Sequence, residues 1–159
     1  MHVSASVLVN LPASTDDPRV VVSHARKEDS APRGRLSGVG PILIIEDDFA
    51  IRHTLAQVLA DEGFEVISAA DGREALLLMA EHHTRPGLIV LDLRMPAMSG
   101  LQFRAVQQSY ARWSDIPVLV ITASRFPPPE LVSLGLNHVF RKPLDLDALV
   151  DKIKLLTAL

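Results

Sequence analysis

The centre of the chain carries an apolar run that ends in one carboxylate, Leu88-Ile-Val-Leu-Asp-Leu-Arg-Met-Pro-Ala-Met-Ser-Gly100. A run of this kind, with no polar alternation, indicates a strand buried on both faces, as in parallel sheets. Pro96 and Gly100 then mark a loop. We therefore place Asp92 at the carboxyl end of a central strand, the edge at which open α/β sheets bind their ligands.

Length and composition narrow the class of protein. The 159 residues suffice for one domain with a core and an appendage, and 48% hydrophobic with 22% charged residues indicates a mainly globular chain. The net charge of −3 argues against a nucleic-acid surface. The absence of cysteine excludes disulfides and thiolate metal sites, and it fits a reducing, cytoplasmic location. No apolar run is long enough for a membrane span, and the start lacks a signal-peptide pattern.

Residues 1–40 differ from the rest of the chain. They contain no aromatic residue, and residues 13–40 are rich in Ser, Pro, Gly and mixed charge. We predict a largely disordered N-terminal extension or linker over 1–40, with residues 4–11 as a candidate short strand. That candidate, which ends in Leu-Pro, bears a short resemblance to the last strand of the ATP-binding domain of histidine kinases.

From residue 41 to residue 159 the apolar pattern alternates between strands and helices. Buried runs predict strands, and apolar residues at helical spacing, bounded by caps such as Asp48 and Asp145, predict helices. The strands are expected at 42–45, 64–69, 88–93, 116–122 and 137–141, and the helices at 49–60, 72–82, 101–110, 130–134 and 145–157.

Five strand–helix units predict an α/β fold with a doubly wound parallel sheet and helices on both faces. The flavodoxin-like strand order 2-1-3-4-5 is the natural candidate, and it places the first and third strands side by side. Glu46, Asp47 and Asp92 then converge at one edge of the sheet. Arg104 and Arg73 are expected on solvated helix faces.

Three carboxylates at one edge repel one another and raise one another's pKa, and a bound cation removes that conflict. Their oxygen ligands suit Mg²⁺, or Mn²⁺, better than Zn²⁺. Thr122 and Lys142 end the fourth and fifth strands and add a hydroxyl and an ammonium group. This combination around a nucleophilic carboxylate suits phosphoryl transfer to Asp92.

Residues 41–159 resemble the receiver domain of two-component response regulators. The matching motifs are Ile-Glu46-Asp47-Asp48, Leu-Asp92-Leu-Arg-Met-Pro with Gly100, Ile-Thr122-Ala and Lys142-Pro. The resemblance implies that Asp92 accepts a phosphoryl group from the phosphohistidine of a histidine kinase or a histidine phosphotransfer domain, and that the chain is a monomer or weak dimer. The resemblance further implies that Asp47, Asp92 and the backbone carbonyl of Arg94 bind Mg²⁺. It implies that Glu46 acts through water and that Thr122 and Lys142 contact the phosphate. The Lys142–Pro143 peptide bond is expected to be cis.

Two departures from the family pattern concern its conformational switch. The family usually has an aromatic residue three positions before the lysine, where this chain has Val139. The aromatic residue here is Phe140, which faces the other side of the sheet because adjacent strand residues alternate. Residues 127–129 are all proline, and they predict a short or re-angled fourth helix.

Three other functions are alternatives to accepting a phosphoryl group. A haloacid-dehalogenase-type phosphatase needs a second Asp two positions after the first, where this chain has Arg94. The complete set of Asp92, Thr122 and Lys142 argues against a pseudo-receiver, and the lack of a phosphate-binding loop after the first strand argues against a flavin protein. For the whole chain, a stand-alone receiver and the C-terminal fragment of a hybrid histidine kinase both stay open.

Overall fold

The computed structural model describes residues 38–81, 85–125 and 128–158. The linker and strand predicted within residues 1–37 lie outside the described residues. No helix in the described part of the chain is long and apolar enough to cross a membrane.

A five-stranded parallel sheet forms the centre of the domain, in the predicted order β2-β1-β3-β4-β5. The first and third strands pair directly, with Ile45 opposite Leu91. Their side chains are entirely buried because helices cover both faces, which explains their unbroken apolar sequences. The strands are β1 (Ile42–Ile45), β2 (Val66–Ala69), β3 (Leu88–Asp92), β4 (Val118–Thr122) and β5 (His138–Arg141).

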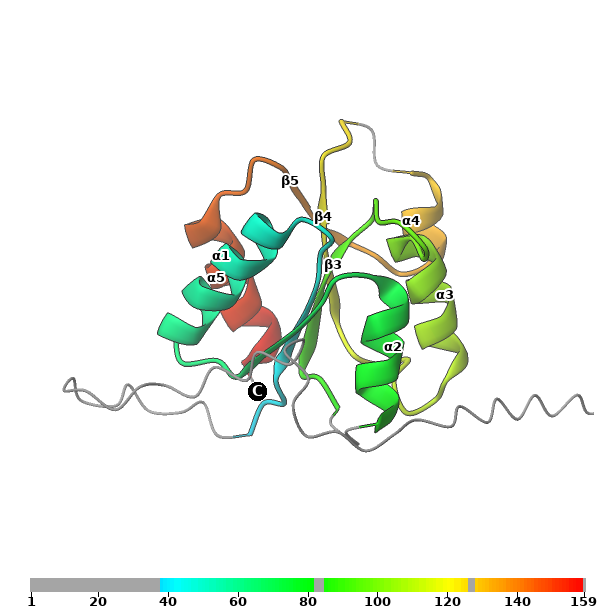
Figure 1. Cartoon of the computed structure of the whole chain (residues 1–159), viewed down its shortest axis with the longest axis horizontal. Coiled ribbons are helices and arrows are strands. Elements are labelled where there is room, and N and C mark those ends of the chain that lie inside the picture. Colours follow the sequence, from blue (N-terminus) through cyan, green and yellow to red (C-terminus); the bar gives the residue numbers. More distant parts are fainter. Residues whose placement is uncertain (1–37, 82–84, 126–127, 159) are drawn as a thin grey trace, which may run out of the picture.

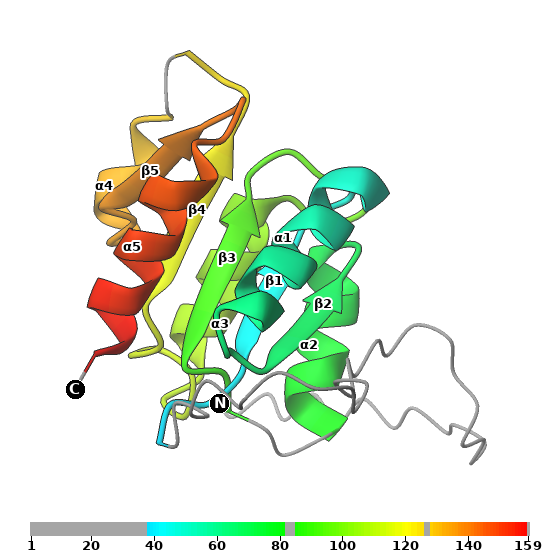
Figure 2. The same cartoon turned by 90° about the vertical axis from the view of Figure 1, so that its left-hand side faces the viewer.

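Helices cover the two faces of the sheet in two groups, as Figures 1 and 2 show. One face packs against α1 and α5, and the other against α2, α3 and α4. Each group closes its own hydrophobic core, so the sheet is the shared middle layer. The helices are α1 (Phe49–Asp61), α2 (Gly72–Glu81), α3 (Gly100–Ser109), α4 (Glu130–Ser133) and α5 (Leu146–Thr157).

Local sequence signals account for several helix ends. The side chains of Asp48 and Asp145 accept hydrogen bonds from the backbone N–H groups of Ile51 and Ala148, as predicted for N-caps. Gly63 follows α1 with a φ of 93°, a conformation that glycine adopts without steric cost. The predicted short fourth helix is confirmed, because α4 has only four residues.

The prediction that Arg104 lies on a solvated helix face is wrong, because its side chain is buried. Its Nε donates to the carbonyl oxygen of Leu134 at 3.0 Å, and its Nη1 donates to Gln107 Oε1 at 2.6 Å. Burial lowers the pKa of its guanidinium. The sequence predicted a helix here but gave no sign that one of its charged side chains meets the end of α4. Arg73 is exposed, as expected.

Candidate phosphoacceptor site

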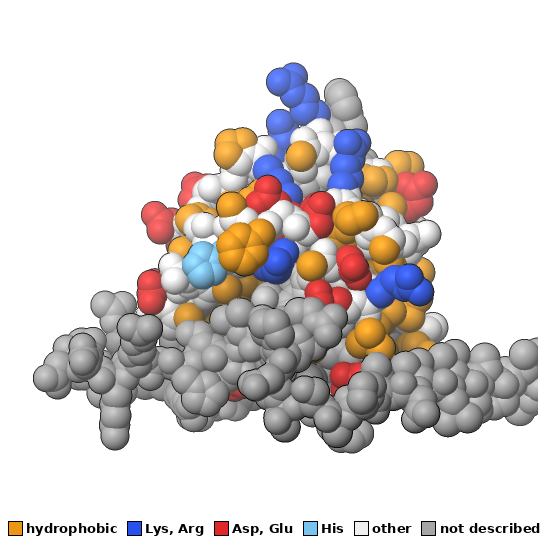
Figure 3. Space-filling view, in the orientation of Figure 1, with side chains coloured by type: hydrophobic (Ala, Val, Ile, Leu, Met, Phe, Trp, Pro, Cys, Tyr) orange, Lys and Arg blue, Asp and Glu red, His pale blue; other side chains and the backbone are white. Residues whose placement is uncertain are grey.

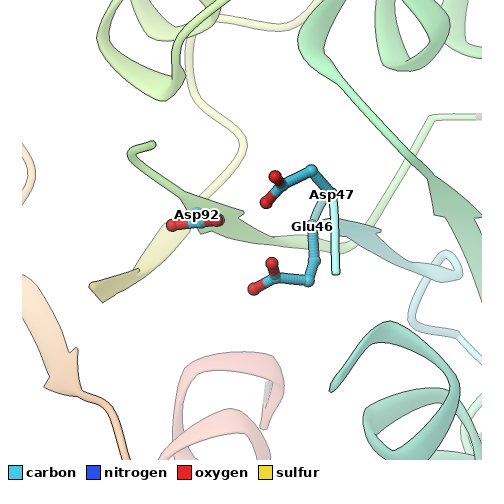
Figure 4. Close-up of side chains that lie close together, drawn as sticks. All are labelled: Glu46, Asp47 and Asp92. Atoms are coloured by element: carbon cyan, nitrogen blue, oxygen red, sulfur yellow. The ribbon is translucent and has the colours of Figure 1, made fainter. Parts of the chain in front are cut away.

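Three carboxylates meet at the carboxyl edge of the sheet. Glu46 and Asp47 directly follow β1, and Asp92 is the last residue of the neighbouring β3. One oxygen atom from each lies within 4.8 Å of the others, and Figure 4 shows the three side chains converging. Glu46 and Asp92 are buried, whereas Asp47 is exposed. The structure thus brings together the acidic residues that the sequence selected.

The start of α1 holds Glu46 in place. Glu46 Oε1 accepts a hydrogen bond from the backbone N–H of Asp48 at 3.0 Å. Arg52 Nη1 donates to the carbonyl oxygens of Glu46 at 2.6 Å and Asp47 at 3.3 Å. These bonds satisfy backbone groups that the end of β1 leaves unpaired. The sequence analysis missed this role of Arg52, whose signal is its position one turn into α1.

Lys142 reaches the same carboxylates from β5. Its Nζ lies 2.8 Å from Glu46 Oε2 and 3.5 Å from Asp92 Oδ2. Apart from this ion pair, Glu46 Oε2 has no hydrogen-bond partner among the described residues. The Lys142–Pro143 peptide bond is cis, as expected from the resemblance. The backbone N–H of Lys142 donates to the Thr122 carbonyl oxygen at 2.8 Å, which joins the ends of β5 and β4.

Burial dominates the electrostatics of the site. It raises the pKa of Glu46 to about 7, against the opposing effect of Lys142, and it also raises the pKa of Asp92. Burial alone would lower the pKa of Lys142, but the bond to Glu46 and the negative charges of Asp92 and Glu46 outweigh it and raise that pKa. The site therefore holds excess negative charge that a cation would neutralise.

The loop after β3 positions Asp92. Asp92 Oδ1 accepts a hydrogen bond from the backbone N–H of Arg94 at 3.2 Å. A side chain on Gly100 would collide with the Asp92 carbonyl oxygen, so the loop can return this close to the strand only with glycine there. Ser99 and Gln102 form a reciprocal capping box that starts α3. The sequence analysis did not use that Ser-x-x-Gln pattern, although it was visible.

Thr122 is the buried last residue of β4, which pairs with β3. Its Oγ1 accepts a hydrogen bond from the backbone N–H of Ser124 at 3.1 Å. This bond orients the hydroxyl oxygen while the hydroxyl hydrogen stays free to donate. Thr122 and Lys142 thus end neighbouring strands next to Asp92, as the predicted strand order requires.

The donor set suits a hard divalent cation. The three carboxylates supply only oxygen ligands, and one oxygen atom from each lies within 4.8 Å of the others. Mg²⁺ is commonly held by one or two carboxylates and several waters, which matches a pair of buried carboxylates beside an exposed one. The residues present therefore fit the predicted metal.

The chain belongs to the family of response regulator receiver domains, whose model matches residues 42–154. Response regulator MprA of Mycolicibacterium vanbaalenii is 36% identical over 117 residues, which are 72% of this chain and 49% of that protein. The chain spans about half the length of the curated relatives it matches. The family match favours the receiver over the phosphatase and flavin-protein alternatives.

Solved structures agree with the family and the fold. The chemotaxis response regulator CheY4 of Vibrio cholerae is 28% identical, with a TM-score of 0.68 over 74% of this chain and 98% of that one. The signal receiver domain of a signal transduction histidine kinase from Syntrophus aciditrophicus is 27% identical, with a TM-score of 0.63 over 75% and 90%. Both likenesses extend over nearly all of the known domain.

Proposed function

We propose that this receiver domain accepts a phosphoryl group on Asp92 from a phosphohistidine, in a Mg²⁺-dependent reaction that it catalyses itself. The observation that carries the proposal is the position of Asp92. It is a buried carboxylate at the end of β3, 3.5 Å from Lys142 and within the acidic cluster of Glu46 and Asp47. Carboxylates are established nucleophiles in aspartyl-phosphate chemistry.

In the proposed step, an Asp92 carboxylate oxygen attacks phosphorus and the phosphorus–nitrogen bond of the donor breaks. The imidazole leaves with the electron pair and takes up a proton. Lys142 and the Thr122 hydroxyl bind phosphoryl oxygens and stabilise their charge. Asp47, Asp92 and the Arg94 carbonyl would hold Mg²⁺ directly, and Glu46 through water. The bound metal would neutralise charge on the phosphoryl oxygens.

The partner in this proposal is a histidine kinase or a histidine phosphotransfer domain, met in the cytoplasm by a monomer or weak dimer. Residues 1–40 serve as a linker or extension to the receiver domain of residues 41–159. Both a receiver on its own and a receiver within a hybrid histidine kinase fit this proposal, and the Syntrophus relative, which is a receiver domain of a histidine kinase, supports the second.

Acetyl phosphate and Mg²⁺ test the proposal without the kinase. The intact mass should rise by one phosphoryl group, and Asp92→Asn should abolish the gain. Asp48→Asn is the matched control, because this exposed neighbour is an N-cap and Asn caps a helix equally well. Equal phosphorylation of the wild type and Asp92→Asn would refute the assignment.

A further inference from the structure

Three exposed arginines each stand beside one of the site residues in the sequence. Arg94 lies two positions after Asp92, Arg125 lies three positions after Thr122, and Arg141 directly precedes Lys142. We call these three residues the arginine collar. None of the three side chains is buried, so none of them fills space in the interior.

The sheet brings the collar together around the site. β3, β4 and β5 are consecutive in the sheet, and Arg141 pairs in register with Thr122. Neighbouring strands are about 5 Å apart, so the two outer strands are separated by about 10 Å at their ends. The ends of the three strands therefore lie within about one Debye length of one another at 0.1 M ionic strength, so positive charges at or just beyond these ends act on the same approaching ion.

The collar charges are not neutralised locally. Within the described part of the chain, no carboxylate forms an ion pair with Arg94, Arg125 or Arg141. Glu130 at the start of α4 and Asp145 at the start of α5 are exposed acidic residues in the neighbouring segments, and neither forms an ion pair with a collar arginine. Figure 3 shows Lys and Arg side chains gathered at the end of the molecule where Figure 1 places the loops after β4 and β5.

The inner site cannot itself attract an anionic donor. Glu46, Asp47 and Asp92 contribute three negative charges when ionised, and Lys142 returns one positive charge, which leaves −2. A bound divalent cation brings this sum only to zero. A phosphoryl donor carries negative charge, so positive groups outside the inner set add the long-range attraction that the inner set does not supply.

We propose that Arg94, Arg125 and Arg141 form an electrostatic collar that draws the dianionic phosphoryl group of the donor toward Asp92. The collar sets the rate of encounter and leaves the chemical step to Asp92, Thr122 and Lys142. This inference rests on the proposed function. The phosphoryl group can come from a free acyl phosphate or from a protein phosphohistidine, and the collar acts on the charge that both share.

The test removes the three charges by Arg94→Gln, Arg125→Gln and Arg141→Gln in one variant. Its matched control is Arg85→Gln, Arg112→Gln and Lys152→Gln, which removes three positive charges from positions away from the carboxyl edge. Both are compared with the wild type for phosphorylation by acetyl phosphate and by a chemically phosphorylated histidine phosphotransfer domain. Amide chemical shifts also follow the binding of acetonylphosphonate, an unreactive analogue of acetyl phosphate.

At low ionic strength, we expect the collar variant to react about tenfold more slowly with both donors and to bind acetonylphosphonate more weakly. The control variant should match the wild type. The difference should shrink in 1 M salt, where the Debye length is about 3 Å. Unchanged rates in the collar variant, with the wild type still phosphorylated, would overturn the collar alone, as would a loss confined to the protein donor. A wild type that is phosphorylated by neither donor would overturn the proposed function, and the collar with it.

Discussion

Glu46 and Asp47 are adjacent in the chain, but their side chains have different surroundings. Glu46 is buried and contacts Lys142, whereas Asp47 is exposed. In the proposed site Asp47 binds the metal directly and Glu46 acts through water. Replacing a residue that only supports the ligands typically costs about 10- to 100-fold in metal affinity, and losing a direct ligand should cost more.

We therefore predict that Asp47→Asn weakens Mg²⁺ binding more than Glu46→Gln does. Well above pH 7, where Glu46 is ionised, both variants remove one negative charge, so the comparison at such a pH isolates direct coordination. Amide chemical shifts during a Mg²⁺ titration give the affinities. Equal affinity in the wild type and Asp47→Asn would refute the metal site, and a larger loss in Glu46→Gln would reverse the two roles.

The raised pKa of Glu46 predicts a pH dependence of stability in the metal-free protein. Between its ordinary value of 4.5 and about 7, the folded state keeps a proton that the unfolded state releases. The free energy of unfolding must then fall as pH rises through this window, by up to about 3 kcal/mol. The shift of Asp92 acts in the same direction.

Glu46→Gln imitates the protonated carboxyl, so we predict that it matches the wild type near pH 4.5 and is more stable than the wild type near pH 7.5. Urea unfolding of both proteins in EDTA at each pH measures the difference. Added Mg²⁺ should restore the stability of the wild type at the higher pH, because it neutralises the same charge. A variant less stable than the wild type at pH 7.5 in EDTA would contradict the predicted protonation.

At the scale of elements, side chains of α3 hold the short helix α4 in place by donating hydrogen bonds to the carbonyl group at the C-terminal end of α4. Arg104 Nε and Gln108 Nε2 both donate to the Leu134 oxygen at 3.0 Å. Gln107 extends the connection to the carbonyl oxygen of Trp113 at 2.8 Å. A cation and an amide at a helix C-terminus satisfy carbonyl groups that four residues of helix cannot pair internally.

We predict that Arg104→Ala lowers the free energy of unfolding by about 2 kcal/mol, because it leaves the buried Gln107 Oε1 without its donor and removes one of the two bonds to the Leu134 carbonyl oxygen. Arg73→Ala, on an exposed helix surface, should change it by less than about 0.5 kcal/mol. Urea unfolding measures both variants. An Arg104→Ala protein as stable as the wild type would show that the buried guanidinium does not hold α4.

The end of β5 has Val139 at the position where the family usually has the aromatic residue of its conformational switch. Val139 packs on the core shared by α2, α3 and α4, whereas Phe140 packs on the opposite core with α1 and α5. The β-branched side chain of Val139 is stiff at χ1, and Phe140 cannot replace a missing aromatic on the other face.

We therefore predict a small response of α4, β5 and α5 to beryllofluoride, a phosphoryl mimic. Larger changes in hydrogen exchange should appear in the loops over residues 94–100 and 123–129, of which 126 and 127 lie outside the described structure. The Asp92→Asn protein, which should not bind the mimic, is the control. Changes centred on residues 137–141 and α5 would contradict this prediction.

Strands and helices could be predicted most accurately where the apolar pattern begins together with the element itself. β1 and α1 began where expected, whereas β2 and β4 each began two residues later, because apolar residues before a strand resemble the strand itself. The convergence of Glu46 and Asp92 was predictable because each directly follows an apolar run and the two runs form neighbouring strands. The role of Arg104 was not, because its partner Leu134 lies on another element and no local pattern reports such a contact.

For the whole molecule, the parallel sheet determines what the domain can do. Strands β1, β3, β4 and β5 all deliver their last residues to one edge, so groups far apart in the sequence surround Asp92. The two helical layers bury that carboxylate from both sides and keep it beside Lys142. We infer that this edge of the sheet serves to place a phosphoryl group on Asp92.

Borohydride reduction after phosphorylation tests that claim most directly, because it converts an aspartyl phosphate into homoserine at the modified position. The protein is incubated with a phosphorylated histidine phosphotransfer domain and Mg²⁺, reduced, digested and sequenced by mass spectrometry. The account predicts homoserine at position 92 alone, and none when EDTA replaces Mg²⁺. Homoserine at another acidic residue with Asp92 intact, or an equal yield in EDTA, would contradict it.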